Sequence, residues 1–227
     1  MKTELSPLEQ ALLTRLSQSE IKEWLRSYAQ PYKELMTYYR CAMMEMETKF
    51  NVLDEELSLL YDRNPIESIK SRLKTPESII EKLVRKGVPL TVDSIEKNLR
   101  DIAGIRVLCS FPSDIYTLAD SLTRQDDVTL VERKDYIAQP KENGYRSLHL
   151  IVGIPIFLHN QKKQMMVEVQ FRTISMDCWA SLEHKIRYKK DIPDPAEIDR
   201  ELLACAEMSA ALDERMEKIH KAAAASR

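Results

Sequence analysis

The chain has 227 residues, of which 44% are hydrophobic and 31% are charged, and its formal net charge is -2. This composition fits a globular protein and excludes nucleic-acid binding through bulk positive charge, so that any basic site must be local. No apolar run approaches the length of a membrane span, and acidic residues stand where a signal peptide would be apolar. We therefore expect a cytoplasmic protein that does not bind membranes.

The Cys and His residues show no metal-binding or disulfide pattern. The four Cys residues are far apart without a C-x-x-C pair, and no two of the four His residues are spaced as i and i+4. We expect the thiols to be reduced and to behave as small apolar side chains.

Helical signals come first in chain order. Ser6 followed by Pro7 is typical of a helix N-cap and first helical residue, and helical spacing of apolar residues continues to about residue 62. The pattern predicts an N-terminal helical segment over 1–62. A second cap-then-Pro pattern at Thr75 predicts a short helix that Gly87 would end.

The period of the apolar residues then changes to two. We predict strands over 104–111, 127–137, 146–152 and 164–172, with a crossover helix after the first of them. Two amphipathic helices follow, over 175–190 and from Asp194-Pro195 onward; Met176, Trp179, Ala180, Leu182 and Ile186 would share one face of the first. We predict an α+β fold, with a mixed β-sheet of about five strands flanked by helices and long N- and C-terminal helices. A central domain would span 63–192, and 193–227 would be a C-terminal helix that packs either on the protein's own core or on a partner in an oligomer.

In the predicted strand 164–172, the alternation of side chains places three polar residues on one face. Glu168, Gln170 and Arg172 point away from the apolar positions between them, although a solvated polar face would show the same pattern. Asp101 precedes another strand, where it is either a loop cap or a partner of Glu168 in a two-carboxylate site. Such a pair binds Mg²⁺ together with substrate phosphates.

Two further segments carry candidate ligand-binding residues. Basic residues flank the predicted helix that has Ser78 in its first turn: Arg72, Lys74, Arg85 and Lys86. They either bind a polyphosphate together with the helix N-terminus or simply form a solvated charged surface. The loop PKENGYRSLH contains an Asn-Gly turn signal. It is either a simple hairpin turn or a rigid loop that presents Lys141, Asn143, Tyr145 and His149 to a nucleotide.

Read together and in order, these segments resemble the synthetase domain of the RelA/SpoT family, in particular the stand-alone small alarmone synthetases. The resemblance covers about residues 60 to 190, and it implies that 63–192 is the catalytic domain. The matching residues are R-x-K-x-x-x-S at Arg72, Lys74 and Ser78; R-D-x-x-G-x-R at Arg100, Asp101, Gly104 and Arg106; Y-x-x-x-P-K-x-N-G-Y-x-S-x-H from Tyr136 to His149; E-x-Q-x-R at Glu168, Gln170 and Arg172; and W-A-x-x-E-H from Trp179 to His184.

The resemblance implies a nucleotidyltransferase-like synthetase fold and transfer of the β,γ-pyrophosphate of ATP to the ribose 3'-OH of GTP or GDP, which gives (p)ppGpp and AMP. For the donor, it implies that Arg72 and Arg106 flank the adenine and that Lys74, Ser78 and Arg85 bind the phosphates of ATP. It implies that Asp101 and Glu168 are catalytic residues that hold Mg²⁺, and that Glu168 is also the base. For the acceptor, it implies that Tyr145 stacks on guanine and that the nucleotide is placed by Lys141, Asn143, His149 and Gln170.

The resemblance also implies a homotetramer formed through the terminal helices, and synthesis without hydrolysis because the sequence has no His-Asp dipeptide. Some members are activated by bound product through an aromatic residue before the R-x-K motif; the segment 66–70 lacks an aromatic residue, so the sequence does not predict whether this protein shares that regulation. Two rival hypotheses remain: a catalytically idle module that binds nucleotides or single-stranded RNA, and a nucleotidyltransferase that acts on RNA ends. No motif supports RNA as a ligand.

Overall fold

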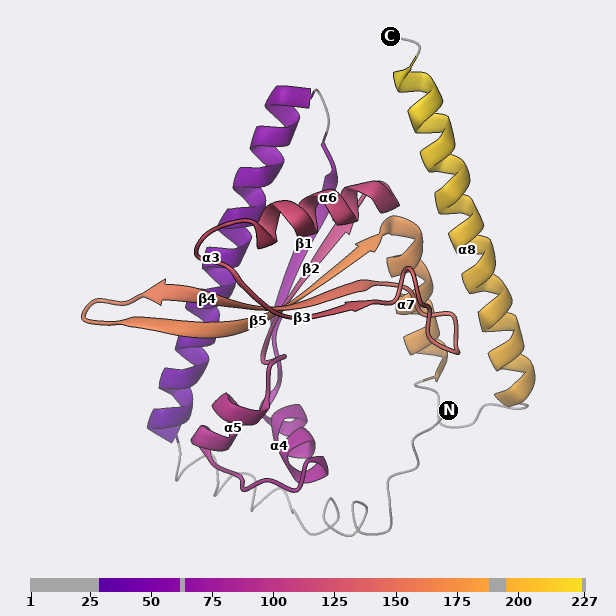
Figure 1. Ribbon diagram of the computed structural model, residues 1–227. Helices are drawn as coiled ribbons and strands as arrows, with labels where there is room; N and C mark the ends of the chain where they lie inside the picture. The colour runs from indigo at the N-terminus through magenta and orange to yellow at the C-terminus, as the bar shows by residue number, and fades with distance from the viewer. Residues whose placement is uncertain (1–28, 62–63, 188–194, 226–227) are drawn as a thin grey trace.

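The computed structural model describes residues 29–61, 64–187 and 195–225, so the predicted cap at Ser6-Pro7 lies outside the described residues (Figure 1). The elements follow in the order α3 (Ala29–Tyr61), β1 (Ile66–Leu73), α4 (Pro76–Arg85), α5 (Val92–Asn98), β2 (Ala103–Cys109), α6 (Pro112–Thr123), β3 (Thr129–Asp135), β4 (Leu148–Phe157), β5 (Lys162–Thr173), α7 (Ile174–Arg187) and α8 (Pro195–Ala224). No helix in these ranges is both long and apolar enough to cross a bilayer.

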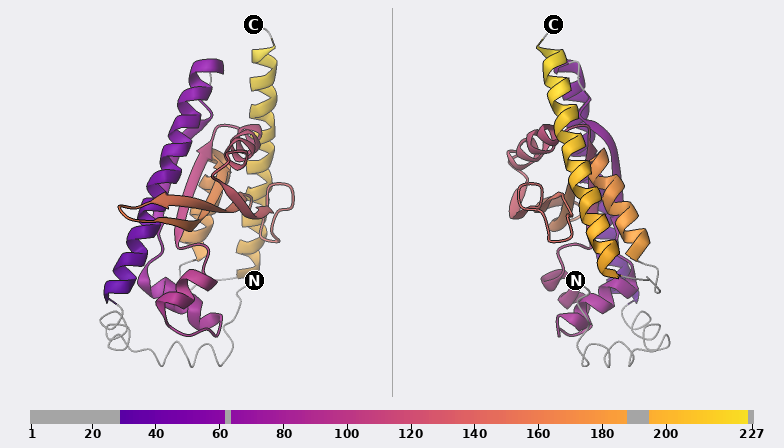
Figure 2. Two further views of the ribbon diagram at one scale, coloured as in Figure 1. Left: turned by 60° about the vertical axis from the view of Figure 1, so that its left-hand side comes forward. Right: turned by 90° about the vertical axis from the view of Figure 1, so that its right-hand side faces the viewer.

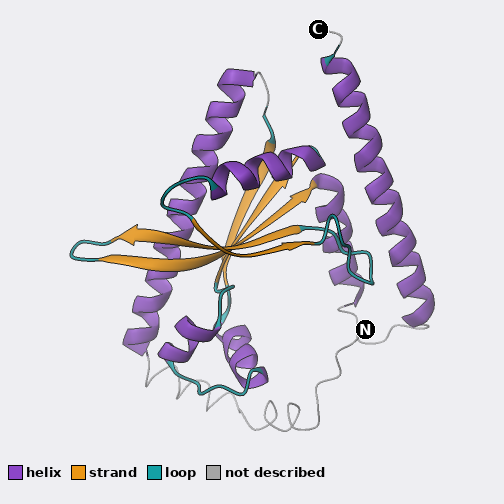
Figure 3. Ribbon diagram, in the orientation of Figure 1, coloured by secondary structure: helices purple, strands orange, loops and turns teal. Residues whose placement is uncertain are grey.

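The strands form one mixed sheet in the order β1-β2-β5-β4-β3 (Figure 3). Only β2 and β5 are parallel, and the other neighbouring strands are antiparallel. The predicted α+β fold is therefore confirmed. β1 and α5 were not predicted, because β1 alternates charged and apolar residues only weakly and α5 has just seven residues.

One face of the sheet carries the hydrophobic core. Alternate residues of β2, β4 and β5, such as Val107, Leu150 and Val169, are buried beneath α3 and α6. Phe50 of α3 meets Phe171 of β5 edge to face, with ring centroids 5.6 Å apart. Because α3 packs on this face, the helix that we predicted as part of an N-terminal segment shares one core with the sheet.

The opposite face is covered in part by α7, which begins where β5 ends. The hydroxyl of Thr173, the last residue of β5, accepts a hydrogen bond from the backbone N–H of Met176 and so caps α7 without an intervening loop. Helix α8 packs along α7 as a long outer helix (Figure 2). Asp213 of α8 accepts a hydrogen bond of 2.6 Å from the same Thr173 hydroxyl.

Packing of α7 differs from its predicted pattern. Met176, Trp179 and Ala180 are buried as expected, but Leu182 is 50% exposed and Ile186 is 37% exposed. The apolar face predicted for α7 is therefore covered only in part, because α8 covers the side of α7 that carries Trp179 and Ala180.

The loop that joins β3 to β4 is held by α8. β3 and β4 pair antiparallel, so the Asn-Gly turn lies in the connection of a hairpin, as one of the two interpretations predicted. Gly144 has a φ of +85°, and a Cβ placed on it would stand 2.5 Å from the Cβ of Ala206. Only glycine fits this position, because both the backbone conformation and the close approach of α8 exclude a side chain.

Gly144→Ala should therefore destabilise the fold more than Gly87→Ala, its matched control. Gly87 also has a positive φ, of +66°, but nothing lies within 4 Å of an added Cβ. We expect a loss of about 1 kcal/mol for Gly87→Ala from backbone strain, and roughly 1 to 3 kcal/mol more for Gly144→Ala from the clash with α8. Urea unfolding measures both, and equal losses would contradict the contact.

Candidate active site

The register of the sheet builds the site as two rows of side chains across its open face. One row runs Arg72, Gly104, Glu168, Ile151 and Glu132, and the next runs Lys70, Arg106, Gln170, His149 and Lys134. These residues lie on the face opposite the core because side chains alternate along each strand. Five strands thus bring residues from distant parts of the sequence onto one polar surface.

Glu168 lies at the centre of this surface with both carboxylate oxygens occupied. Its Oε1 is 3.4 Å from Nδ1 of His149, and its Oε2 accepts a hydrogen bond of 3.0 Å from Gln170. Burial alone would raise the pKa of the Glu168 carboxyl, but the contacts from His149 and Gln170 outweigh burial and lower that pKa below its ordinary value. Glu168 is therefore ionised at neutral pH.

Asp101 is held by two lysines at the entrance of β2. Its Oδ2 lies 2.8 Å from Nζ of Lys74 and 2.6 Å from Nζ of Lys82. Burial would raise the pKa of the Asp101 carboxyl, but the hydrogen bonds from these lysines lower it below its ordinary value. The other oxygen, Oδ1, is buried without a hydrogen-bond partner.

A second network extends over the same face from α7. Asp177 accepts hydrogen bonds from Arg106 at 3.0 Å and from Arg172 at 2.9 Å. Arg172 also donates to the Tyr145 hydroxyl at 2.8 Å and to Gln170 at 3.3 Å. The Tyr145 hydroxyl in turn is 2.8 Å from Nε2 of His149, so the network reaches the side chain beside Glu168.

The loop after β3 presents its cation and its aromatic rings together. Nζ of Lys141 is 4.6 Å from the ring centroid of Tyr136 and 4.8 Å from that of Tyr145. The Asn143 side chain accepts a hydrogen bond from the backbone N–H of Tyr145 and directs its amide toward Glu183 of α7 at 3.4 Å. The loop is therefore preformed by contacts within it and by contacts with α7 and α8.

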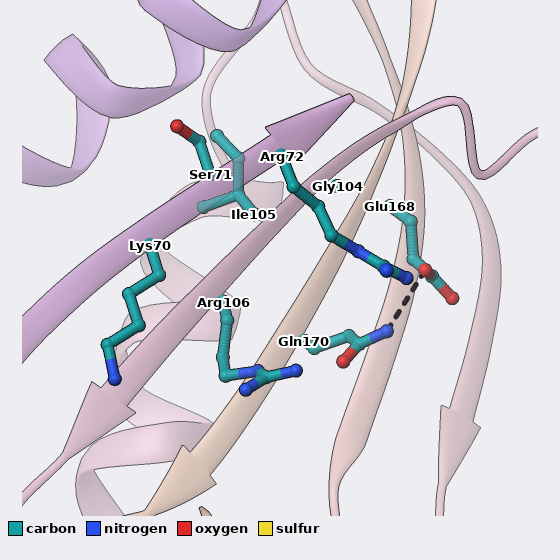
Figure 4. A pocket seen from close by; sticks show the side chains of 8 residues that line it. All are labelled: Lys70, Ser71, Arg72, Gly104, Ile105, Arg106, Glu168 and Gln170. Atoms are coloured by element: carbon teal, nitrogen blue, oxygen red, sulfur yellow. Dashed lines mark hydrogen bonds between the residues drawn. The ribbon is translucent and has the colours of Figure 1, made fainter. Parts of the chain in front are cut away.

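Three adjoining cavities divide the polar face. The first contains Arg72, Arg106, Glu168 and Gln170 (Figure 4). Glu168 also lines the second, between α4, α5 and β3, which is bordered by Lys82, Lys86, Lys97, Asn98, Arg100, Asp101, Glu132, Lys134 and Ile151. Arg72 and Arg106 also line the third, which α7 closes with Ala180, Ser181, Glu183, His184 and Lys185. Figure 4 shows the Arg72 side chain extending toward Glu168 within the shared space.

The structure brings most of the predicted site residues together, but not all of them. Ser78 stays in the first turn of α4, where its hydroxyl accepts a hydrogen bond from the N-cap residue Thr75. Arg85 is exposed in the last turn of the same helix and lines none of the three cavities. Their roles toward a nucleotide remain predictions.

Sequence reasoning missed two residues that hold the site together. Lys82 follows Ser78 by one helical turn and so faces the same way, a spacing that could have indicated its contact with Asp101. Asp177 carried no such signal, because its two arginine partners come from β2 and β5 and meet only in the folded sheet.

The carboxylate pair suits a hard divalent cation. Asp101 and Glu168 line the same cavity, and Asp101 keeps one oxygen without a partner. Among the residues that the structure describes, no group of three or more His, Cys, Asp or Glu side chains could hold a metal ion on its own. Two carboxylates completed by substrate phosphates and water are a usual way to bind Mg²⁺.

The fold and the polar face define the class of protein: an α+β domain whose mixed sheet carries carboxylates and cations together on its open face. A family model described as "Region found in RelA / SpoT proteins" matches residues 71–193. The chain belongs to this family. It is 44% identical over 197 residues to the GTP pyrophosphokinase YwaC of Bacillus subtilis, a match that covers 87% of this chain and 94% of that protein.

Solved structures agree with this assignment. Small alarmone synthetase 2 from Bacillus subtilis superimposes with a TM-score of 0.76 and 44% identity, covering 85% of this chain and 99% of that chain. Small alarmone synthetase 1 from the same organism, bound to its product pppGpp, gives a TM-score of 0.76 and 36% identity over 85% and 97% of the two chains. The structure of the same synthetase bound to AMPCPP gives a TM-score of 0.72 and 33% identity, covering 86% of this chain and 98% of that chain.

Asp101→Asn should change how stability depends on pH. Because the folded pKa of Asp101 lies below its ordinary value of 3.8, the ionised carboxylate stabilises the folded protein above that value, and this contribution is lost as the pH falls through the folded pKa. We expect the variant to lose about 2 kcal/mol at neutral pH, and the difference from the parent protein to shrink below about pH 4.

Urea unfolding at several pH values measures this difference. Asp93→Asn is the control, because Asp93 forms an exposed pair with Lys97 and should change stability little at any pH. A loss for Asp101→Asn that stays constant down to about pH 3 would show that its ionisation does not contribute.

Proposed function

We propose that the protein is a GTP pyrophosphokinase that transfers the β,γ-pyrophosphate of ATP to the 3'-OH of GTP or GDP and releases AMP. The observation that carries this proposal is the ionised Glu168 carboxylate, which lies between a cavity with two arginines and a cavity lined by lysines. Similarity to enzymes named for this activity, over most of this chain and of each relative, supports it. We propose that the reaction is synthesis only, as the sequence has no His-Asp dipeptide.

On the donor side, Arg72 and Arg106 would flank the adenine of ATP. Both line the first and third cavities, and planar guanidinium groups stack well on an aromatic base. Lys74 would neutralise the triphosphate from its position beside Asp101. Ser78 and Arg85 would reach the same phosphates from α4, which begins with a capped N-terminus.

On the acceptor side, Tyr145 would stack on guanine, with Lys141, Asn143 and His149 placing the nucleotide. Glu168 would accept the proton of the 3'-OH as that oxygen attacks the β-phosphorus of ATP and the bond to the α-phosphate breaks, releasing AMP. Gln170 would hold the Glu168 carboxylate in place through its hydrogen bond of 3.0 Å.

Asp101 and Glu168 would hold Mg²⁺, whose charge would stabilise the transferring phosphates. The partnerless Oδ1 of Asp101 supports this assignment. Because phosphate oxygens would supply further ligands, the ion and the nucleotides would bind together.

Incubation with ATP, GDP and Mg²⁺, followed by anion-exchange chromatography, tests the proposed reaction. AMP should appear in step with a more highly phosphorylated guanine nucleotide, and removal of the metal by EDTA should stop the reaction until Mg²⁺ is restored in excess. Nucleotide binding without any transfer would favour an idle binding module, and AMP attached to RNA would favour a nucleotidyltransferase.

Glu168→Gln tests the proposed base. The amide keeps the shape of the side chain but cannot accept the proton, so kcat should fall by about 10² to 10⁴ while GDP still binds. Glu132→Gln is the control, because Glu132 lies in the same row at the edge of the site but has no proposed role. A rate for Glu168→Gln within about twofold of the parent protein would remove Glu168 from the mechanism.

We also propose that the protein is a cytoplasmic homotetramer assembled through its terminal helices. The support is an apolar stripe on α8, where Met208, Leu212, Met216 and Ile219 are 64%, 52%, 49% and 62% exposed. Their spacing of three or four residues places them on one helical face. Such a continuous apolar surface is typical of a protein interface.

Replacement of Met208 and Met216 by Glu should dissociate the tetramer, because two charges on the stripe would have to be buried at the interface. Light scattering after size exclusion measures the mass of the assembly. Glu207→Lys with Glu214→Lys is the control, because both residues are exposed elsewhere on α8. A double Met variant that keeps the parent mass would place the interface on another surface.

A further inference from the structure

We propose that Asp177 is a positioning residue that couples the ATP side of the site to the acceptor side. The inference rests on the proposed function, and it concerns a residue that lines none of the three cavities. Asp177 is 7% exposed, and a single one of its oxygens, Oδ1, accepts hydrogen bonds from both Arg106 and Arg172. It thus joins Arg106, which lines the first and third cavities, to Arg172, which contacts Tyr145 of the loop between β3 and β4.

The shared oxygen of Asp177 offsets the repulsion between the two positively charged arginines. Burial lowers the pKa of Arg106, and the nearby charge of Arg172 lowers it further, because the two guanidinium groups repel each other. Asp177 opposes both effects, since its negative charge lies against both cations. It comes from the first turn of α7, where the helix dipole also favours a negative charge. Without that carboxylate, nothing in this contact would offset the repulsion between the two guanidinium groups, and holding them in their present positions would destabilise the folded protein.

From Arg172 two routes reach the proposed base. One passes through the Tyr145 hydroxyl and His149 to Oε1 of Glu168, and the other passes through Gln170 to Oε2. Arg172 is therefore the branch point of a network of hydrogen bonds that the 3.4 Å contact between His149 and Glu168 closes. A displacement of its guanidinium group would disturb the guanine-stacking ring and the carboxylate at the same time.

Through Oδ1 of Asp177, this network would connect the binding of ATP to the binding of the acceptor nucleotide. Arg106 would contact the adenine, so ATP binding fixes its guanidinium group and with it the direction of the Asp177 carboxylate. That carboxylate orients Arg172 and, through it, Tyr145. Each nucleotide should therefore bind more tightly when the other is present, by the same factor in both directions.

Binding measurements without turnover test the coupling. The probes are GDP and AMPCPP, the ATP analogue in which the oxygen between the α- and β-phosphates is replaced by carbon, so that no transfer can occur. Calorimetry gives the Kd of each probe alone and with the other probe at saturation. We expect the parent protein to bind each probe about tenfold more tightly in the presence of the other, and Asp177→Asn to reduce that factor to about one.

Two further variants make the result specific. Arg172→Lys keeps the positive charge but cannot contact Asp177, Tyr145 and Gln170 at once, so it should also abolish the coupling, even if Asp177→Asn does not fold. Asp114→Asn is the matched control, because Asp114 is a buried aspartate, 1% exposed, that caps α6 on the other face of the sheet. It should lower stability without changing the coupling factor.

The outcomes separate this inference from the proposed function. A parent protein that transfers pyrophosphate but binds the two probes independently, or an Asp177→Asn variant with undiminished coupling, overturns the role of Asp177 and leaves the activity intact. Equal loss of coupling in Asp114→Asn also overturns it, since that result reports general destabilisation. A parent protein that binds neither probe overturns both proposals.

Discussion

The strict alternation of side chains along β5 is the constraint on which the rest of the molecule depends. Val167, Val169 and Phe171 enter the core beneath α3 and α6, and this fixes Glu168 and Gln170 on the open face. A shift of one residue in register would exchange the two sets and destroy the core and the site together. Stability of the fold therefore guarantees the position of the proposed base.

Each of the three carboxylates of the site contacts two partners before any ligand binds. Asp101 contacts two lysines, Asp177 contacts two arginines, and Glu168 contacts a histidine and an amide. Such pairing offsets the desolvation of buried charges. A polyphosphate would compete for the same lysines, so its binding would exchange one set of ionic contacts for another rather than fill a neutral cleft.

Periodicity and turn chemistry predicted much of this architecture. The segments around β2, β4 and β5, the capped start of α4 at Thr75 and the start of α8 at Pro195 are found as the sequence indicated. Elements with weak local patterns, β1 and α5, could not be found in this way, because their places depend on pairing and packing with distant residues. Asp177 was missed for the same reason: its chemistry comes from tertiary contacts.

The contact between Gly144 and Ala206 restricts how this chain can diverge or be recombined. A terminal helix transplanted from a relative would have to present an equally small residue to the loop, because a longer side chain at that position would push the turn away from the sheet. Position 206 lies outside the site, yet its freedom to vary is limited by the geometry of the loop between β3 and β4. Helix and loop are therefore expected to evolve, and to be engineered, as one unit.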